Sequence, residues 1–87
     1  MKNYAVVLFE WAADELHPWA NLWLHRQTGL SYFYSPRIEP NGPYFHMVLI
    51  DRPPAGNQIE FEMQIPHAFV KAVFNAADLK RIGFTAP

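Results

Sequence analysis

The four histidines are the first candidates for chemistry, because imidazole serves both as a catalytic acid or base and as a metal ligand. No two of them have the i, i+4 spacing that places two imidazoles on one helical turn. His17 and His25 would lie about 12 Å apart along a helix, which is too far to share one metal ion. The spacing therefore predicts no local metal site, although distant segments could still assemble one with Asp14 or Glu10. The histidines are His17, His25, His46 and His67.

Other catalytic patterns have weak support. Glu60 and Glu62 stand two residues apart, and two like charges on one strand face can raise a carboxyl pKa for acid–base work. Alternating glutamates are equally typical of a solvated strand face that discourages edge pairing. The only serines, Ser31 and Ser35, do not lie in a nucleophile elbow, and the four glycines are too isolated to cradle a phosphate. We therefore predict no catalytic residue and no cofactor, and we favour a protein that is not an enzyme.

The aromatic content is the strongest functional signal. Fourteen of the 87 residues are Phe, Tyr or Trp, and a domain of this size has too much surface for its volume to enclose all of its large apolar side chains. Trp and Tyr are enriched at contact hot spots, because they combine a large rigid surface with one polar group. We therefore expect an aromatic interaction surface. Its candidate residues are Trp11, Trp19, Trp23, Tyr32, Tyr34 and Tyr44.

Three functions follow from these features. The leading one is a small non-enzymatic binding protein that acts through its aromatic surface, either as a homo-oligomer or on a larger protein partner. The second is a small enzyme or ligand-binding protein with a pocket between sheet and helix, lined by Asp14 and by three of the histidines (His17, His25 and His46). The third is a single-stranded nucleic-acid binder that stacks bases on aromatic rings near Arg37 and Arg52. The alternative for the aromatic residues themselves is simple core packing.

Composition places limits on these functions. With 87 residues, 51% of them apolar and 17% charged, the chain is predicted to form a single domain spanning residues 1–87. A formal net charge of −1 without a basic cluster argues against nucleic acid as the partner. The longest early apolar run, residues 5–9, is too short for a membrane span or a signal-peptide core. There is no cysteine, so neither a disulfide nor a thiolate site is expected, and a cytoplasmic location fits best.

Two early segments must position these side chains. Residues 3–11 are apolar at both phases of the strand alternation, which predicts a central strand covered on both faces. Residues 12–28 are ambiguous. As a helix, the segment would be capped by Asp14, would accept Pro18 only in its first turn, and would end at Gly29. As a strand over residues 21–27, it would turn at Thr28–Gly29 into the next strand.

The later segments are better marked. Residues 30–38 are predicted to form a strand that ends early or lies at an edge because of Pro36, and the 40–43 turn, Pro-Asn-Gly-Pro, leads to a strand over 44–51. Residues 52–57 form a loop by composition. Residues 59–65 alternate strictly between apolar and polar, which predicts a half-buried strand. Residues 67 to about 80 carry an apolar stripe at helical spacing, including Val70, Val73 and Phe74.

The predicted fold class is therefore α+β. It consists of a small antiparallel sheet of four or five strands, a C-terminal helix packed on one face, and a second helix after the first strand.

Overall fold

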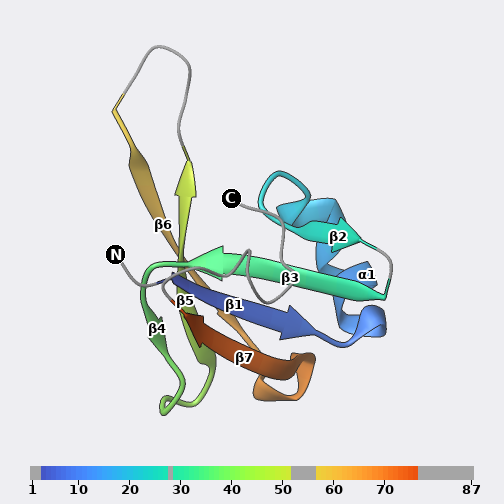
Figure 1. Ribbon diagram of the computed structural model, residues 1–87. Coiled ribbons are helices and arrows are strands. Elements are labelled where there is room, and N and C mark those ends of the chain that lie inside the picture. The colour runs from blue at the N-terminus through green and yellow to red at the C-terminus, as the bar shows by residue number, and fades with distance from the viewer. Residues whose placement is uncertain (1–2, 28, 52–56, 77–87) are drawn as a thin grey trace.

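The computed structural model describes residues 3–27, 29–51 and 57–76 of the chain (Figure 1). The described residues form two antiparallel sheets and one α-helix, so the chain is mixed α+β and mostly strand. The elements in chain order are β1 (Asn3–Leu8), α1 (Glu10–Ala20), β2 (His25–Gln27), β3 (Leu30–Ser35), β4 (Ile38–Glu39), β5 (Phe45–Asp51), β6 (Ile59–Ile65), the single 3-10 turn η1 (His67–Phe69) and β7 (Val70–Ala76).

The four-stranded sheet is built around β1, in the order β2-β3-β1-β7. Val6 pairs with Phe33 of β3 on one side and with Val73 of β7 on the other. Val6 and Val7 point to opposite faces of the sheet, and both are buried. This explains the apolar run of the first strand, because a strand covered on both faces needs apolar residues at both phases.

The predicted C-terminal helix is wrong. Residues 67–69 form one 3-10 turn, and residues 70–76 form the strand β7, so the only helix described lies near the N-terminus. The apolar residues Val70, Val73 and Phe74 fit a helical stripe, but β-branched and aromatic residues also favour strands. The edge of β1 that β3 leaves unpaired decides between helix and strand, because residues 70–76 satisfy the backbone hydrogen bonds of β1 there when they form a strand. A register shift between Val7 and Leu8 accommodates one extra residue in β7.

The ambiguous segment contains a helix and then a strand, so each interpretation is right in part. The helix α1 begins at Glu10 and ends at Ala20. Pro18 lies in its last turn and not in its first, and the helix ends two residues beyond it. Gly29 does not stop the helix; it has a φ of 76° in the two-residue connection from β2 to β3.

The second sheet has the order β4-β5-β6. The predicted strand over 30–38 is two strands, since β3 ends before Pro36 and the chain crosses into the second sheet as β4. Neither Asn41 nor Gly42 has a positive φ in the following turn, because five residues separate β4 from β5 and the tight geometry is not required. The bounds of β6 match the predicted 59–65 strand.

One core joins the two sheets and the helix. The face of the first sheet that carries Val6 and Phe33 packs with Met47 and Ile65 of the second sheet. The helix contributes mainly small residues, Ala12, Ala13 and Ala20 among them. Figure 1 shows the outer end of the β5–β6 hairpin extending away from the four-stranded sheet.

Two further observations complete the fold. Among the described residues, no helix combines the length and the apolar character needed to cross a membrane. The predicted loop over 52–57 falls almost wholly outside the described residues, as does the last part of the predicted C-terminal helix.

Candidate functional site

The six aromatic residues predicted to form an interaction surface separate into three groups. Trp11, Trp19 and Tyr44 are exposed, Trp23 and Tyr34 are partly buried, and Tyr32 is fully buried. They do not all belong to one exposed surface, because Tyr32 is fully buried in the four-stranded sheet whereas Trp11 and Trp19 are exposed on α1.

Among the large apolar residues that the structure describes, those at the end of α1 are the most exposed. Trp19 is 82% exposed and Leu22 is 80% exposed. The backbone amides of Trp23 and Leu24 both donate to the carbonyl of Ala20, at 3.0 Å each, so the chain continues as a turn beyond the last helical residue. Residues three and four apart share a face in such a turn, which brings Leu22 and Trp23 to the side of Trp19.

Trp23 connects this helix end to β6. Its ring packs edge-on against Phe61, with the ring centroids 5.6 Å apart. Phe61 is 41% exposed and Ile59 is 45% exposed, although both lie on the face of the second sheet that continues into the core. We define the α1–β6 patch as these five residues: Trp19, Leu22, Trp23, Ile59 and Phe61.

The reason for this exposure lies in the length of the hairpin. Ile65 and Met63 at one end of β6 pack on the shared core, whereas the other end extends past it. The strict alternation of β6 predicted a half-buried strand, and only the part near Ile65 is buried. Alternation specifies which residues share a face, but it does not specify how far the opposing layer reaches.

A second aromatic group lies at the beginning of α1. Phe9 stacks on Trp11, and the Trp11 ring packs edge-on against Phe69 with centroids 5.1 Å apart. The amide of Phe9 also donates to the carbonyl of Phe69, at 3.2 Å. These contacts hold η1 against the helix, so Trp11 has a structural role even though half of its side chain is exposed.

The third aromatic group is internal to the four-stranded sheet. The His25 ring stacks on Tyr32 at 5.2 Å and packs edge-on against Tyr34 at 4.9 Å. Burial disfavours the imidazolium and lowers the pKa of His25. Burial of the phenol, together with the charge of a Tyr32 phenolate, raises the pKa of Tyr34 to about 12.

Asp14 does not cap the helix, because α1 begins four residues earlier. It contacts Arg26 of β2, with 2.9 Å between Oδ1 and Nη2. Arg26 also donates to Glu10 at 2.9 Å and to the Ser31 hydroxyl at 3.2 Å. Hydrogen bonds to the two carboxylates raise the pKa of Arg26. These contacts fasten the first turns of α1 to the β2–β3 hairpin.

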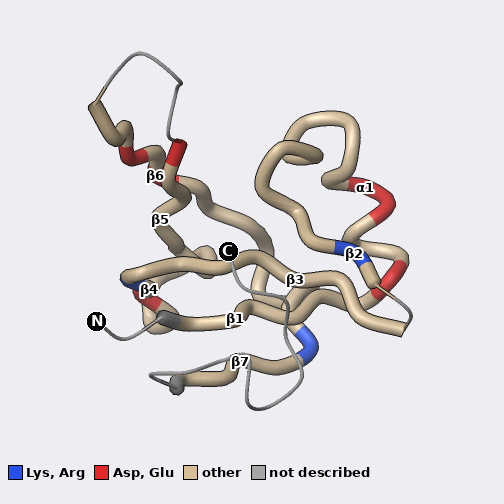
Figure 2. Tube along the Cα trace, turned by 45° about the horizontal axis from the view of Figure 1, so that its top comes forward, with Lys and Arg blue, Asp and Glu red and all other residues tan. Residues whose placement is uncertain are grey.

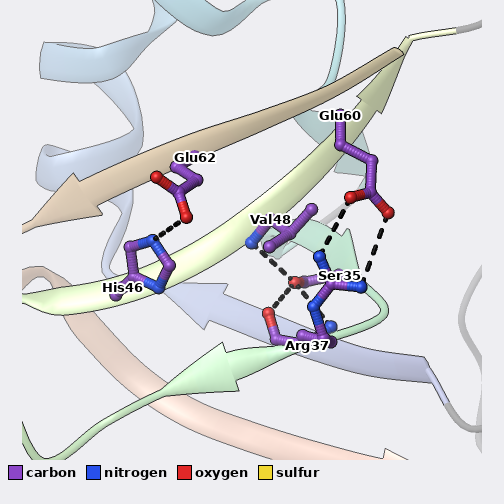
Figure 3. A network of polar contacts seen from close by, with 6 residues as sticks. All are labelled: Ser35, Arg37, His46, Val48, Glu60 and Glu62. Carbon is purple, nitrogen blue, oxygen red and sulfur yellow. Dashed lines mark hydrogen bonds and ion pairs between the residues drawn. The ribbon is translucent and has the colours of Figure 1, made fainter.

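A polar network lies at the junction of the two sheets (Figure 3). The buried Ser35 hydroxyl accepts from the amides of Val48 at 3.0 Å and Arg37 at 3.3 Å, and it donates to the Arg37 carbonyl. The Arg37 guanidinium donates to both carboxylate oxygens of Glu60, at 2.9 and 3.5 Å. Ser35 therefore secures the crossover between the sheets, while Arg37 reaches over to β6.

The second glutamate of β6 has a different partner. Glu62 Oε1 lies 3.6 Å from His46 Nε2, a pair that is ionic only when the imidazole is protonated. Each of the two glutamates thus faces a separate basic side chain and not the other carboxylate (Figure 3). This arrangement offers no shared proton of the kind that a catalytic carboxylate pair would use.

The residues proposed for a His- and Asp-lined pocket lie on three elements, α1, β2 and β5. His25 lies on one sheet and His46 on the other, and Asp14 is bound to Arg26. Within residues 3–27, 29–51 and 57–76, no three His, Asp or Glu side chains are grouped so that they could hold a metal ion. His67 contacts the carbonyl of Gly42 at 2.7 Å and so ties η1 to the β4–β5 turn.

Sequence reasoning missed three members of the α1–β6 patch: Leu22, Ile59 and Phe61. Leu22 gave a usable signal, because it follows a proline that limits the helix. The other two had none, since an apolar residue in an alternating strand is normally buried. Comparison of the chain with models of protein families, with curated proteins and with solved structures found no match to any of them.

Proposed function

We propose that this chain is a protein-binding module and that the α1–β6 patch is its contact surface. The observation that carries the proposal is the exposure of Trp19 and Leu22, each at least four-fifths exposed and within four residues of Trp23, which packs on Phe61 of β6. Large apolar side chains grouped on one surface commonly mark sites of protein contact.

The patch has the physical character of a binding hot spot. Trp19 and Trp23 can each bury a large area at a small cost in side-chain entropy, because they have few rotatable bonds. The surface beneath them is well supported: Trp23 is packed on Phe61, and β6 is paired along its full length with β5. A supported apolar surface loses less entropy on binding than a flexible one does.

Polar residues lie next to the patch in the chain. Asn21 stands between Trp19 and Leu22, while Glu60 and Glu62 alternate with the β6 members and therefore lie on the other face of that strand. A protein partner that covers the apolar patch and continues over the edge of β6 can also contact these carboxylates. Self-association and a larger partner protein are both compatible with this geometry.

The test is a double variant, Trp19→Ser with Leu22→Ser, compared with the control Tyr44→Ser, which removes an exposed aromatic ring outside the patch. Proteins retained by the immobilised wild-type chain from a lysate of its source cells are identified, purified and titrated by calorimetry. Light scattering over a concentration series measures self-association in parallel. We expect the double variant to weaken binding or self-association by about 30-fold or more, as for hot-spot residues, and the control to retain it.

Equal binding by all three proteins would refute the assignment of the patch. A wild-type chain that remains a monomer at every concentration, and that binds none of the purified candidates, would refute the function itself.

A further inference from the structure

The strand β6 lies at the edge of its sheet. Within the part of the chain that the structure describes, β5 is the only strand that pairs with it. Every second backbone N–H and C=O of an edge strand points away from the sheet, where it can pair with another chain. With seven residues, β6 offers an edge longer than an average strand.

The two faces of this edge differ in chemistry. Ile59, Phe61 and Met63 lie on one face, and Glu60 and Glu62 lie on the other. The apolar face is the one on which Trp23 meets Phe61. A strand added to the edge of β6 would therefore direct every second side chain toward the α1–β6 patch and the remaining ones alongside the glutamates.

The polar face is acidic. Glu60 and Glu62 lie on this face, and β5 and β6 contain no Lys or Arg; in Figure 2, the two strands carry red segments and no blue ones. The third carboxylate of the two strands, Asp51, pairs with Ile59 and so lies on the other face. Arg37 balances Glu60, but Glu62 is 78% exposed and has an ionic partner only when His46 is protonated. Basic side chains directly across from these glutamates would be favoured, and acidic ones disfavoured.

This charge pattern argues against a second copy of β6 as the added strand. If two copies of β6 paired antiparallel, the apolar faces of both copies would lie on the same side of the joined sheet only in every second register. The register centred on Glu62 sets that residue against its own copy, and the register centred on Phe61 sets Glu60 against Glu62. The register centred on Met63 avoids both pairs, but it sets Glu60 opposite Pro66, which has no N–H to donate.

We propose that β6 receives an extended segment of a partner protein in which apolar residues alternate with Lys or Arg. The proposal rests on the protein-binding function above and specifies the partner. Backbone hydrogen bonds to the edge supply affinity, as in other cases of strand addition. The apolar side chains of the segment extend the contact to Phe61 and Trp23, and its basic side chains pair with Glu60 and Glu62.

The first experiment uses synthetic peptides as probes of the full chain. One peptide alternates valine with lysine and is long enough to pair with all of β6, and a second alternates valine with glutamate. A third is the basic peptide with proline at alternate positions, which removes the peptide N–H groups that would donate to β6. Amide NMR spectra locate binding, and calorimetry measures it. We expect only the basic peptide to bind, with its largest shifts and its cross-strand contacts at residues 59–65.

The second experiment reverses the charges. Glu60→Lys with Glu62→Lys should reverse the preference, so that the acidic peptide binds and the basic peptide no longer does. Glu60→Gln with Glu62→Gln should weaken binding of the basic peptide by roughly 2- to 30-fold, the range expected for two cross-strand charge pairs. Glu15→Gln, which removes a charge from an exposed position of α1, is the matched control and should leave binding unchanged.

The outcomes separate this inference from the binding function. If the Trp19→Ser/Leu22→Ser variant loses its partner while the basic peptide fails to bind β6, the function stands and strand addition is overturned. Equal binding of basic and acidic peptides, binding of the proline peptide, or cross-strand contacts between two copies of β6 would also overturn it.

Discussion

The His25 imidazole is partly buried between two tyrosine rings of the four-stranded sheet. Its pKa is lowered from 6.5 because burial penalises the charged ring. The unfolded chain therefore binds a proton at His25 at a pH where the folded chain does not. The stability that depends on neutral His25 is complete above 6.5 and is lost as the pH falls toward the lower pKa of the folded state.

We predict that the free energy of unfolding falls between about pH 7.5 and pH 5, and that this fall is smaller in His25→Phe, which keeps the stacking but cannot titrate. Urea denaturation of both proteins across this range measures the effect. An equal or larger acid loss in the phenylalanine variant would show that His25 is not desolvated in the folded chain.

Among the elements, the β2–β3 hairpin depends on Gly29. Its φ of 76° lies in the left-handed region, which side chains other than glycine rarely adopt, although a Cβ would meet no atom within 4 Å. Any cost of a larger residue is therefore backbone strain and not a clash. Gly42 is a natural comparison, because its φ is not positive and an added Cβ would make only an ordinary 3.5 Å contact with the Tyr44 carbonyl.

We expect Gly29→Ala to destabilise the protein by about 1–2 kcal/mol. Gly42→Ala should change the free energy of unfolding by less than about 0.5 kcal/mol. Thermal or chemical denaturation of the two variants beside the wild type gives the comparison. Similar losses in both would mean that the hairpin does not require the left-handed conformation.

At the scale of the whole molecule, one core holds two sheets and a helix together, and the α1–β6 patch lies at its surface, where Trp23 packs against it. Leu49 of β5 is buried in that core, whereas Leu22 is among the most exposed apolar residues that the structure describes. The same substitution at these two positions separates core packing from surface exposure, because it removes identical atoms from opposite environments.

We predict that Leu49→Ala costs about 2–5 kcal/mol of stability and that Leu22→Ala changes it by no more than about 0.5 kcal/mol. The test is chemical denaturation of both variants, in which the midpoints are compared while the dependence of the free energy of unfolding on denaturant concentration stays the same. A large loss in the Leu22 variant would place that side chain inside the folded structure and would remove a main support of the proposed contact surface.

Much of the local structure could be predicted from residue patterns. The alternation of β6 specified its bounds and its faces, and the two-phase apolar run of β1 specified a central strand. Pro36 marked the end of β3 because proline restricts both its own φ and the residue before it. These features depend on neighbouring residues, so the sequence by itself contains the necessary information.

Tertiary pairing decided the rest. Val70, Val73 and Phe74 fit a helical period, but their residue types also favour a strand, and β7 forms because β1 has an edge whose backbone groups need partners. The candidate site depended on the same kind of information. Of the predicted aromatic residues, Trp19 and Trp23 lie in the α1–β6 patch. The patch also includes Ile59 and Phe61, whose exposure is determined by how far the core extends beneath β6. Burial is a property of the layers that meet in space, whereas the sequence alone specifies which side chains share a face.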